Sequence, residues 1–138
     1  MGSFEIMEHT ADVGVVACGD SLAEALCFAA KGMLSIMADT CDVSPAEQAR
    51  ISVSSTDTEA LVVDWLNELI YLYGVEGFLP REFQIAVDEA GTSIDALCLG
   101  ERSAPRRRQI RTEVKAATYH GLEVSHNGQW RIRVVLDV

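Results

Sequence analysis

Residues 3–18 of the chain, SFEIMEHTADVGVVAC, decide how it folds. Two short apolar segments, 3–7 and 13–18, have the composition of core strands, and a stretch with a histidine and two acidic residues separates them. Asp12 stands at the edge of the second segment. The chain closes on another apolar segment, VVLDV, which carries Asp137. If these first and last strands meet, the fold gathers carboxylates from both ends of the chain.

Capping sequences and the spacing of apolar residues predict two helices. Ser21 and Glu24 have the spacing of a capping box, in which side-chain oxygens accept from the exposed amides of a first turn, and Thr56 with Glu59 repeats it. Apolar residues then recur at three- and four-residue spacing, which predicts one buried stripe per helix, and Gly74 suits the second C-terminal cap. The stripes comprise Leu22, Ala25, Leu26, Ala29, Met33 and Met37, then Leu61, Val62, Trp65, Leu66, Leu69, Leu72 and Tyr73, with Asp64, Asn67 and Glu68 opposite the second stripe.

The remaining apolar segments predict strands. They cover 50–54, 82–88, 92–100 and 109–117, and a terminal hairpin follows them. Short hairpin connections favour an antiparallel or mixed sheet with the two helices packed on one face. The sequence therefore predicts an α+β fold, a two-layer sandwich, and its length fits one domain, 1–138.

Side-chain matching predicts the register of the terminal hairpin. A two-residue loop would set apolar residues opposite charged ones on both strands, whereas a loop of residues 126–128 sets apolar residues opposite each other. We therefore expect the three-residue loop, with Gly128 in the left-handed conformation. This register pairs Leu122 with Ile132, Val124 with Trp130 and Glu123 with Arg131.

The charge of the chain is strongly acidic and unevenly distributed. There are 21 acidic and 11 basic residues, for a formal net charge of −10. Such a surface repels phosphate backbones, which disfavours a general nucleic-acid binder. A basic window from Arg102 to Arg111 contains no acid, and we interpret it as a solvated loop, although it could touch a phosphate or an acidic partner. Its five arginines are Arg102, Arg106, Arg107, Arg108 and Arg111.

The lack of a recognisable targeting signal and the usage of cysteine both favour the cytoplasm. No apolar run reaches the length of a membrane span, and residues 1–5 lack the basic and apolar segments of a secretory signal. The four cysteines show no paired spacing of the zinc or redox type, so we interpret them mainly as buried thiols in a reducing compartment. The sequence thus predicts neither a membrane anchor nor a disulfide framework.

Two aspartates near opposite ends of the chain are candidate metal ligands. Asp12 and Asp137 supply hard oxygen donors, and Val138 adds a terminal carboxylate in a chain that ends there. Three carboxylates held close together repel unless a cation or protons compensate them. Surface acids account for most aspartates in so acidic a chain, so the residues alone leave an ordinary solvated surface as the alternative.

His9 and His120 are candidates for acid–base chemistry, because histidine titrates near neutral pH. Lys115 lies close to His120 in the sequence. However, the sequence contains no nucleophile elbow, glycine-rich phosphate loop or paired metal-histidine spacing. The catalytic interpretation therefore has no supporting motif.

Four motifs in order resemble the archease family and span nearly the whole chain. The first motif contains Asp12, the second lies in the expected second helix, the third contains His120, and the fourth closes the chain. They read HTADVG at 9–14, WLNELIYL at 65–72, EVKAATYH at 113–120 and VVLDV at 134–138. Four ordered matches are much more specific than any one of them.

The resemblance implies a small, chaperone-like cytoplasmic protein that activates the RtcB-type RNA ligase of tRNA splicing and RNA repair. The family is not itself known as a ligase. It promotes GTP-dependent guanylylation of the ligase's active-site histidine and supports multiple turnover. We therefore expect no enzymatic activity from the isolated chain, no membrane partner and no direct binding of nucleic acid.

The resemblance also assigns residues. Asp12 matches the motif aspartate of the family, and Asp137 with Val138 matches its terminal metal-binding pair, which implies calcium or another hard divalent cation. In the same motifs, His9, Lys115 and His120 are expected to support the site or to face the partner. The run Arg106–Arg108 is more basic than the family leads us to expect, which leaves open what that loop contacts.

Two other classes of function stay open. A small metal-assisted hydrolase would use Asp12, Asp137 and His120, and would turn over substrate in isolation. A plain interaction module would bind a partner through the acidic surface without any metal.

Overall fold

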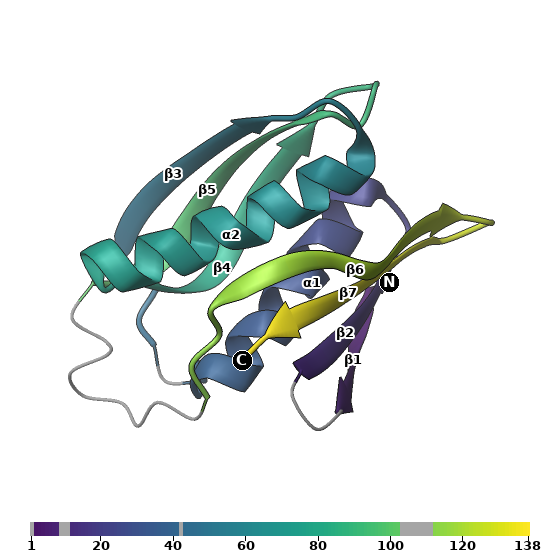
Figure 1. The fold of residues 1–138 in the computed structure, drawn as a ribbon. Coiled ribbons are helices and arrows are strands. Elements are labelled where there is room, and N and C mark those ends of the chain that lie inside the picture. Colours follow the sequence, from purple (N-terminus) through teal and green to yellow (C-terminus); the bar gives the residue numbers. More distant parts are fainter. Residues whose placement is uncertain (1, 9–11, 42, 103–111) are drawn as a thin grey trace.

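The structure, a computed structural model, describes residues 2–8, 12–41, 43–102 and 112–138. The described residues form two helices and seven strands (Figure 1). In chain order these are β1 (Ser3–Glu8), β2 (Asp12–Gly19), α1 (Leu22–Met37), β3 (Glu47–Ser54), α2 (Thr58–Glu76), β4 (Leu79–Val87), β5 (Ser93–Glu101), β6 (Ala116–His126) and β7 (Trp130–Asp137). The predicted α+β class, with antiparallel strands and two helices, is confirmed.

The strands divide between two antiparallel sheets. One has the order β1-β2-β7-β6 and the other the order β3-β5-β4. Helix α1 packs mainly on β2 and also contacts β4, whereas α2 packs mainly beside β6 and also contacts β3. Each helix therefore contacts both sheets. The apolar stripes of the two helices form the core together with the buried strand residues. The pairing of β2 with β7 brings the beginning and the end of the chain together.

The helix ends show why the chain turns where it does. At α1, the Ser21 hydroxyl accepts from the Glu24 amide at 3.1 Å, as the capping box predicts. At α2, the N-cap is Asp57, whose carboxylate accepts from the Ala60 amide at 2.7 Å, so the helix starts one residue later than Thr56 predicts. The prediction that Gly74 caps α2 is wrong, because the left-handed residue that ends the helix is Gly77.

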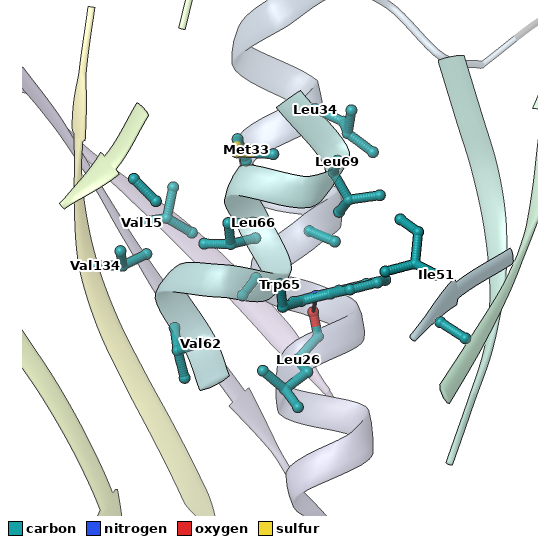
Figure 2. Close-up of a cluster of buried hydrophobic side chains, with 14 of the residues drawn as sticks. Val15, Leu26, Met33, Leu34, Ile51, Val62, Trp65, Leu66, Leu69 and Val134 are labelled. Carbon is teal, nitrogen blue, oxygen red and sulfur yellow. Dashed lines mark hydrogen bonds between the residues drawn. The ribbon is translucent and has the colours of Figure 1, made fainter. Parts of the chain in front are cut away.

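The largest fully buried side chain of the described core lies between the two helices and the small sheet. Trp65 of α2 is fully buried, and its ring extends toward Ile51 of β3 (Figure 2). Its indole nitrogen donates to the backbone carbonyl of Leu26 in α1 at 3.0 Å, and its ring meets Phe83 edge-on at 5.8 Å between centroids. This side chain therefore joins both helices and both edges of the small sheet without leaving its polar atom unpaired.

The predicted register of the terminal hairpin is wrong by two residues. His126 pairs with Trp130 across a loop of residues 127–129, and Val124 opposes Ile132. Both registers oppose apolar residues, but the observed one stacks the His126 ring on Trp130 at 4.4 Å between centroids. A register shift between Thr118 and Glu123 absorbs the extra residues in β6. The positive φ of 77° at Gly128 agrees with the prediction. The predicted partner of Glu123, Arg131, is wrong, because Glu123 opposes Arg133, although the Glu123 carboxylate still lies 3.6 Å from the Arg131 guanidinium.

All four cysteines are free thiols. Burial, together with a smaller contribution from the neighbouring Cys27, raises the pKa of Cys98 to about 12. Cys98 thus fits the interpretation of a buried, unreactive thiol, whereas Cys41 is exposed. Neither helix in the described part of the chain is long and apolar enough to cross a membrane.

Candidate metal centre

The centre lies where the first residue of β2 meets the last residue of β7. In the antiparallel pairing of these strands, Asp12 is the direct partner of Asp137, and Val13 is the partner of Leu136. From the sequence alone, carboxylates gather only if the first and last strands meet. The structure shows that these strands pair. Two carboxylates from residues more than a hundred positions apart therefore occupy one cross-strand pair.

The burial pattern shows which way these carboxylates point. Val134 and Leu136 are fully buried, whereas Asp137 is exposed and Asp12 is half-buried. Because side chains alternate along a strand and direct cross-strand partners share a face, Asp12 and Asp137 both project away from the core. Like charges directly opposite each other on two strands repel.

No group of the described chain compensates this repulsion. Within residues 2–8, 12–41, 43–102 and 112–138, neither aspartate side chain has a hydrogen bond or an ion pair. The pair alone also falls short of a full coordination sphere, because no group of three or more His, Cys, Asp and Glu residues that could hold a metal occurs among the described residues. Two hard carboxylate donors fit a divalent cation that takes its other ligands from backbone oxygen, a terminal carboxylate or water.

Strand β6 holds the same end of β7 from the other side. Ala116 is the second partner of Asp137, and the Lys115 amide donates to the Asp137 backbone carbonyl at 2.8 Å. The Lys115 side chain is exposed, and Val138 packs its partly buried side chain against the core. Asp137 is thus fixed by its backbone on both sides, while its carboxylate stays free of described partners.

Of the two candidate histidines, His9 and His120, the structure describes only His120. His120 is exposed in the irregular part of β6, where Gly121 has a φ of 65° and accepts from Arg133 at 2.8 Å. Because Asp137 is paired four residues earlier, at Ala116, His120 lies on the order of 10 Å from the carboxylate pair. It is therefore outside the pair rather than part of it. His9 lies outside the described residues.

One arginine of the basic window has a structural role that the sequence did not indicate. The Arg102 guanidinium lies 3.7 Å from Glu47 and 3.3 Å from Glu76, and it stacks over the Phe78 ring at 5.1 Å. It therefore ties β3 to the end of α2 and is not simply solvated. Arg106, Arg107, Arg108 and Arg111 lie outside the described residues.

Asn67 is the supporting residue that the sequence analysis missed. Its side-chain oxygen accepts from the Ala117 amide at 2.8 Å, and its side-chain nitrogen donates to the Ala117 carbonyl at 3.4 Å. The amide thus acts as a strand partner for the edge strand β6, one residue beyond Ala116. Asn67 lies opposite the apolar stripe, so the sequence did not indicate this role. Only the packing of α2 against β6 brings Asn67 to Ala117.

Comparisons with known proteins agree along the whole chain. Residues 4–138 match the model of the archease protein family (MTH1598/TM1083). Protein archease of Methanosarcina mazei is 38% identical over 139 residues, covering 98% of this chain and 95% of the relative. Protein archease of Sulfurisphaera tokodaii is 35% identical over 139 residues and is matched in full, as is this chain.

Two solved structures have the same fold. The solution structure of protein 1598 from Methanobacterium thermoautotrophicum matches with a TM-score of 0.85 and 35% identity, over 98% of both chains. The crystal structure of an archease from Thermotoga maritima, described as a possible chaperone, matches with a TM-score of 0.63 over 97% of this chain and 96% of that one. At 24% identity it supports the fold alone. With the family match over residues 4–138 and relatives of the same length, the chain belongs to the archease protein family.

Proposed function

We propose that this chain activates an RtcB-type RNA ligase in tRNA splicing and RNA repair, and that it does so as a cytoplasmic accessory protein. In this proposal it promotes the GTP-dependent guanylylation of the ligase and supports repeated turnover. The observation that carries the proposal is the direct pairing of Asp12 with Asp137 in a chain of the archease family. Membership of the family supports the proposed function, and the pairing supports the proposed site.

The proposed site holds calcium, or another hard divalent cation, between Asp12, Asp137 and the carboxylate of Val138 in a chain that ends there. A bound cation would supply positive charge that offsets the repulsion between the two aspartates. The residues of the chain set the position of the donors, because β7 is held by β2 on one side and by the Lys115 amide on the other. Lys115 and His120 are exposed near this end of β6 and are proposed to face the ligase.

The electrostatics of the chain favour a protein partner over nucleic acid. A formal net charge of −10 repels a phosphate backbone, whereas it attracts the cationic surface that an RNA ligase presents to its own substrate. Charges of this kind mainly raise the rate of association, and salt screens them over about 8 Å at physiological ionic strength. Association with the ligase is therefore expected to slow as salt is raised.

The separation of His120 from the aspartates supports an accessory role over a hydrolase. A hydrolase that used Asp12, Asp137 and His120 would need these groups around one reacting atom, and His120 lies on the order of 10 Å away. A metal-free interaction module would leave the repulsion between the paired Asp12 and Asp137 carboxylates without a cation to offset it. We therefore infer that the isolated chain has no turnover of its own.

One experiment separates the three functions. Purified chain is incubated with the ligase and GTP, with and without calcium, and guanylylation is followed by incorporation of labelled GMP. The proposal predicts faster guanylylation that depends on the divalent ion, with no turnover by the chain alone. Activation that is independent of any divalent ion would favour the interaction module. Substrate turnover without the ligase would favour the hydrolase.

A further inference from the structure

Strand β6 contains an insertion that its pairing with β7 does not need. The pairing is regular from Ala116 to Thr118, and it resumes at Glu123, which opposes Arg133. Between these points β6 has four residues, 119–122, where β7 has one. Without three of the four, the same pairs would form one continuous ladder. The insertion therefore has a reason outside the ladder, and bulges in strands often serve to re-aim a side chain beside a functional site.

The insertion holds the side chain of Arg133. The Arg133 guanidinium donates to the Gly121 carbonyl at 2.8 Å. Gly121 has a φ of 65°, and a Cβ built on it would lie 2.9 Å from Arg133 Nη1. Glycine is therefore favoured at this position both by the backbone conformation and by the space that the guanidinium takes. At the start of the insertion, the Thr118 hydroxyl donates to the Val135 carbonyl at 2.9 Å, which fixes β6 where the ladder breaks.

Arg133 projects from the same face of its sheet as the candidate metal centre. Alternate residues of β7 from 132 to 136 are fully buried, so Arg133, Val135 and Asp137 project from the other face. Arg133 Nη1 and Val135 Cγ2 lie 2.9 Å and 3.7 Å from one point, the position of a Cβ on Gly121. The guanidinium is thus held beside Val135. Two strand positions, on the order of 7 Å, then separate Val135 from Asp137.

Arg133 has no acidic partner in the described part of the chain. Of the five arginines described there, three lie within 4.0 Å of a carboxylate, namely Arg50, Arg102 and Arg131. Arg133 and Arg81 donate to backbone carbonyls instead. A guanidinium has five N–H donors, and the bond to Gly121 uses one of them. Arg133 therefore keeps its charge and most of its donors for a ligand, in a chain with 21 acidic residues.

The chemistry on both sides of this gap suits a phosphate group. Asp12 and Asp137 leave coordination positions open on a cation, because no group of three or more acidic, histidine or cysteine ligands occurs among the described residues. Magnesium sites with one or two carboxylates are commonly completed by phosphate oxygens. The planar guanidinium of Arg133 also matches the geometry of phosphate. A terminal phosphate has three acceptor oxygens, so it can contact a cation and a guanidinium at the same time.

We infer that Arg133, held by the insertion in β6, binds the phosphate group of a small ligand whose other oxygens coordinate the cation at Asp12 and Asp137. This inference rests on the proposed function for the cation and adds a class of ligand to it, a phosphate monoester such as a mononucleotide. A formal net charge of −10 disfavours a polyanion, which selects a small ligand over a nucleic-acid chain. The insertion and the glycine at position 121 are then both explained, because together they aim the guanidinium.

The test compares calcium affinity, measured by calorimetry, with and without phenyl phosphate, a soluble phosphate monoester. Benzoate carries a carboxylate on the same ring and is the control for the anion. Arg133→Gln removes the charge, whereas Arg133→Lys keeps the charge without the planar fork. Arg81→Gln is the matched control, since Arg81 also donates to a backbone carbonyl, that of Val43 at 2.9 Å, but in the sheet of β3, β5 and β4. Melting temperature shows that each variant is folded.

Phenyl phosphate is expected to tighten calcium binding by the natural chain and by Arg81→Gln at least about fivefold, because two ligands that contact each other are coupled reciprocally. Benzoate is expected to have no such effect. Arg133→Gln is expected to lose the gain, and Arg133→Lys to keep part of it. Without phosphate, Arg133→Gln is expected to bind calcium as tightly as the natural chain or slightly more tightly, because a like charge has been removed. A merely structural role for Arg133 would instead weaken calcium binding in both conditions.

The contrary outcomes separate this inference from the proposed function. If the natural chain binds calcium and phenyl phosphate has no effect, the inference is overturned and the proposed function stands. A gain that Arg133→Gln retains would show that Arg133 is not the phosphate ligand. An equal gain with benzoate would make the ligand a carboxylate, and a gain with a 5′-phosphorylated oligoribonucleotide but not with a mononucleotide would make it an RNA end. If the natural chain binds no calcium, the proposed metal centre is wrong and this inference fails with it.

Discussion

Asp88 and the pair of Asp12 and Asp137 are carboxylate sites held in opposite ways. Asp88 follows β4, and its side chain accepts from the amides of Thr92 at 2.9 Å and Ser93 at 3.0 Å, and from the Thr92 hydroxyl at 3.2 Å. These donors, the Ser93 amide foremost, hold the pKa of Asp88 below its ordinary value. The charge of Asp88 is therefore compensated within its own turn.

The pair of Asp12 and Asp137 has the reverse arrangement. Each carboxylate faces a like charge across two strands, and no described residue donates to either side chain. The turn at Asp88 is thus complete without any ligand, while the pair gains most from a charge that comes from outside the chain. The comparison teaches that the hydrogen-bond donors around an acidic residue, and not its exposure, distinguish a structural carboxylate from one that can receive a cation.

The largest expected effect is on ligase activation by Asp12→Asn. The amide keeps the shape of the side chain but removes the charge that a hard cation needs, so guanylylation is expected to fall to the rate of the ligase alone. Asp88→Asn is the matched control, since it removes one carboxylate of the same kind from a site that has its own donors. Full activation by Asp12→Asn, measured by labelled GMP incorporation, would show that the pair is not the site.

A smaller effect is expected from removing the support that holds β6 beside the pair. Asn67→Ala leaves the Ala117 amide and carbonyl without their side-chain partner, which is expected to lower the free energy of unfolding by about 1–2 kcal/mol in urea titrations. Asn67→Asp keeps an acceptor for the Ala117 amide and is expected to fall in between. An unchanged unfolding midpoint for Asn67→Ala would mean that water replaces the contact without loss.

Amidation of Val138 tests a charge at the edge of the pair. In a chain that ends at Val138, an amidated terminus made by chemical ligation removes one carboxylate and adds almost no volume. Calcium affinity is expected to fall, but less than in Asp12→Asn, because both aspartates remain. A tag before residue 1 is the control for bulk at a terminus. Equal calcium affinity of the amidated and free forms would restrict the site to Asp12 and Asp137.

The smallest expected effect concerns Asp88 and depends on pH. Because the pKa of Asp88 is lower in the folded chain than its ordinary 3.8, its charge stabilises the fold above that pH, and this contribution is lost as pH falls through the folded value. Asp88→Asn is therefore expected to lower the melting temperature at pH 7, and by progressively less as pH is lowered below 3.8. A difference in melting temperature that does not shrink as pH falls below 3.8 would show that the carboxylate charge is not what matters in this turn.

Local sequence signals predicted where the two helices lie, and they predicted the exact start of α1 because a single capping residue fixes it. The capping box at Ser21 is present, and the apolar stripes are buried except for the half-buried Tyr73. Where two local solutions exist, the sequence could not decide. Thr56 and Asp57 are both good N-caps, and Gly74 and Gly77 are both possible C-caps, so only the tertiary structure shows that Asp57 and Gly77 take these roles.

Contacts between distant segments were less predictable. The hairpin register failed because the shift between Thr118 and Glu123 changes the count of residues in β6, and no residue pattern announces it. The role of Asn67 also depends on how α2 lies against β6. The meeting of Asp12 with Asp137 could be suggested from the sequence because each lies at one end of an apolar strand. The resemblance to family motifs was still needed to select these two from 21 acidic residues.

The most direct test of the central claim is a pair of measurements on Asp12→Asn, made beside the natural chain and Asp88→Asn. Without calcium, Asp12→Asn is expected to unfold at a free energy up to about 1 kcal/mol higher than the natural chain, because the repulsion across β2 and β7 is relieved. In a calorimetric titration, the natural chain and Asp88→Asn are expected to bind calcium at one site, while Asp12→Asn loses that binding. Equal calcium affinity of Asp12→Asn and the natural chain would contradict the account, because the paired carboxylates would then not be what the cation recognises.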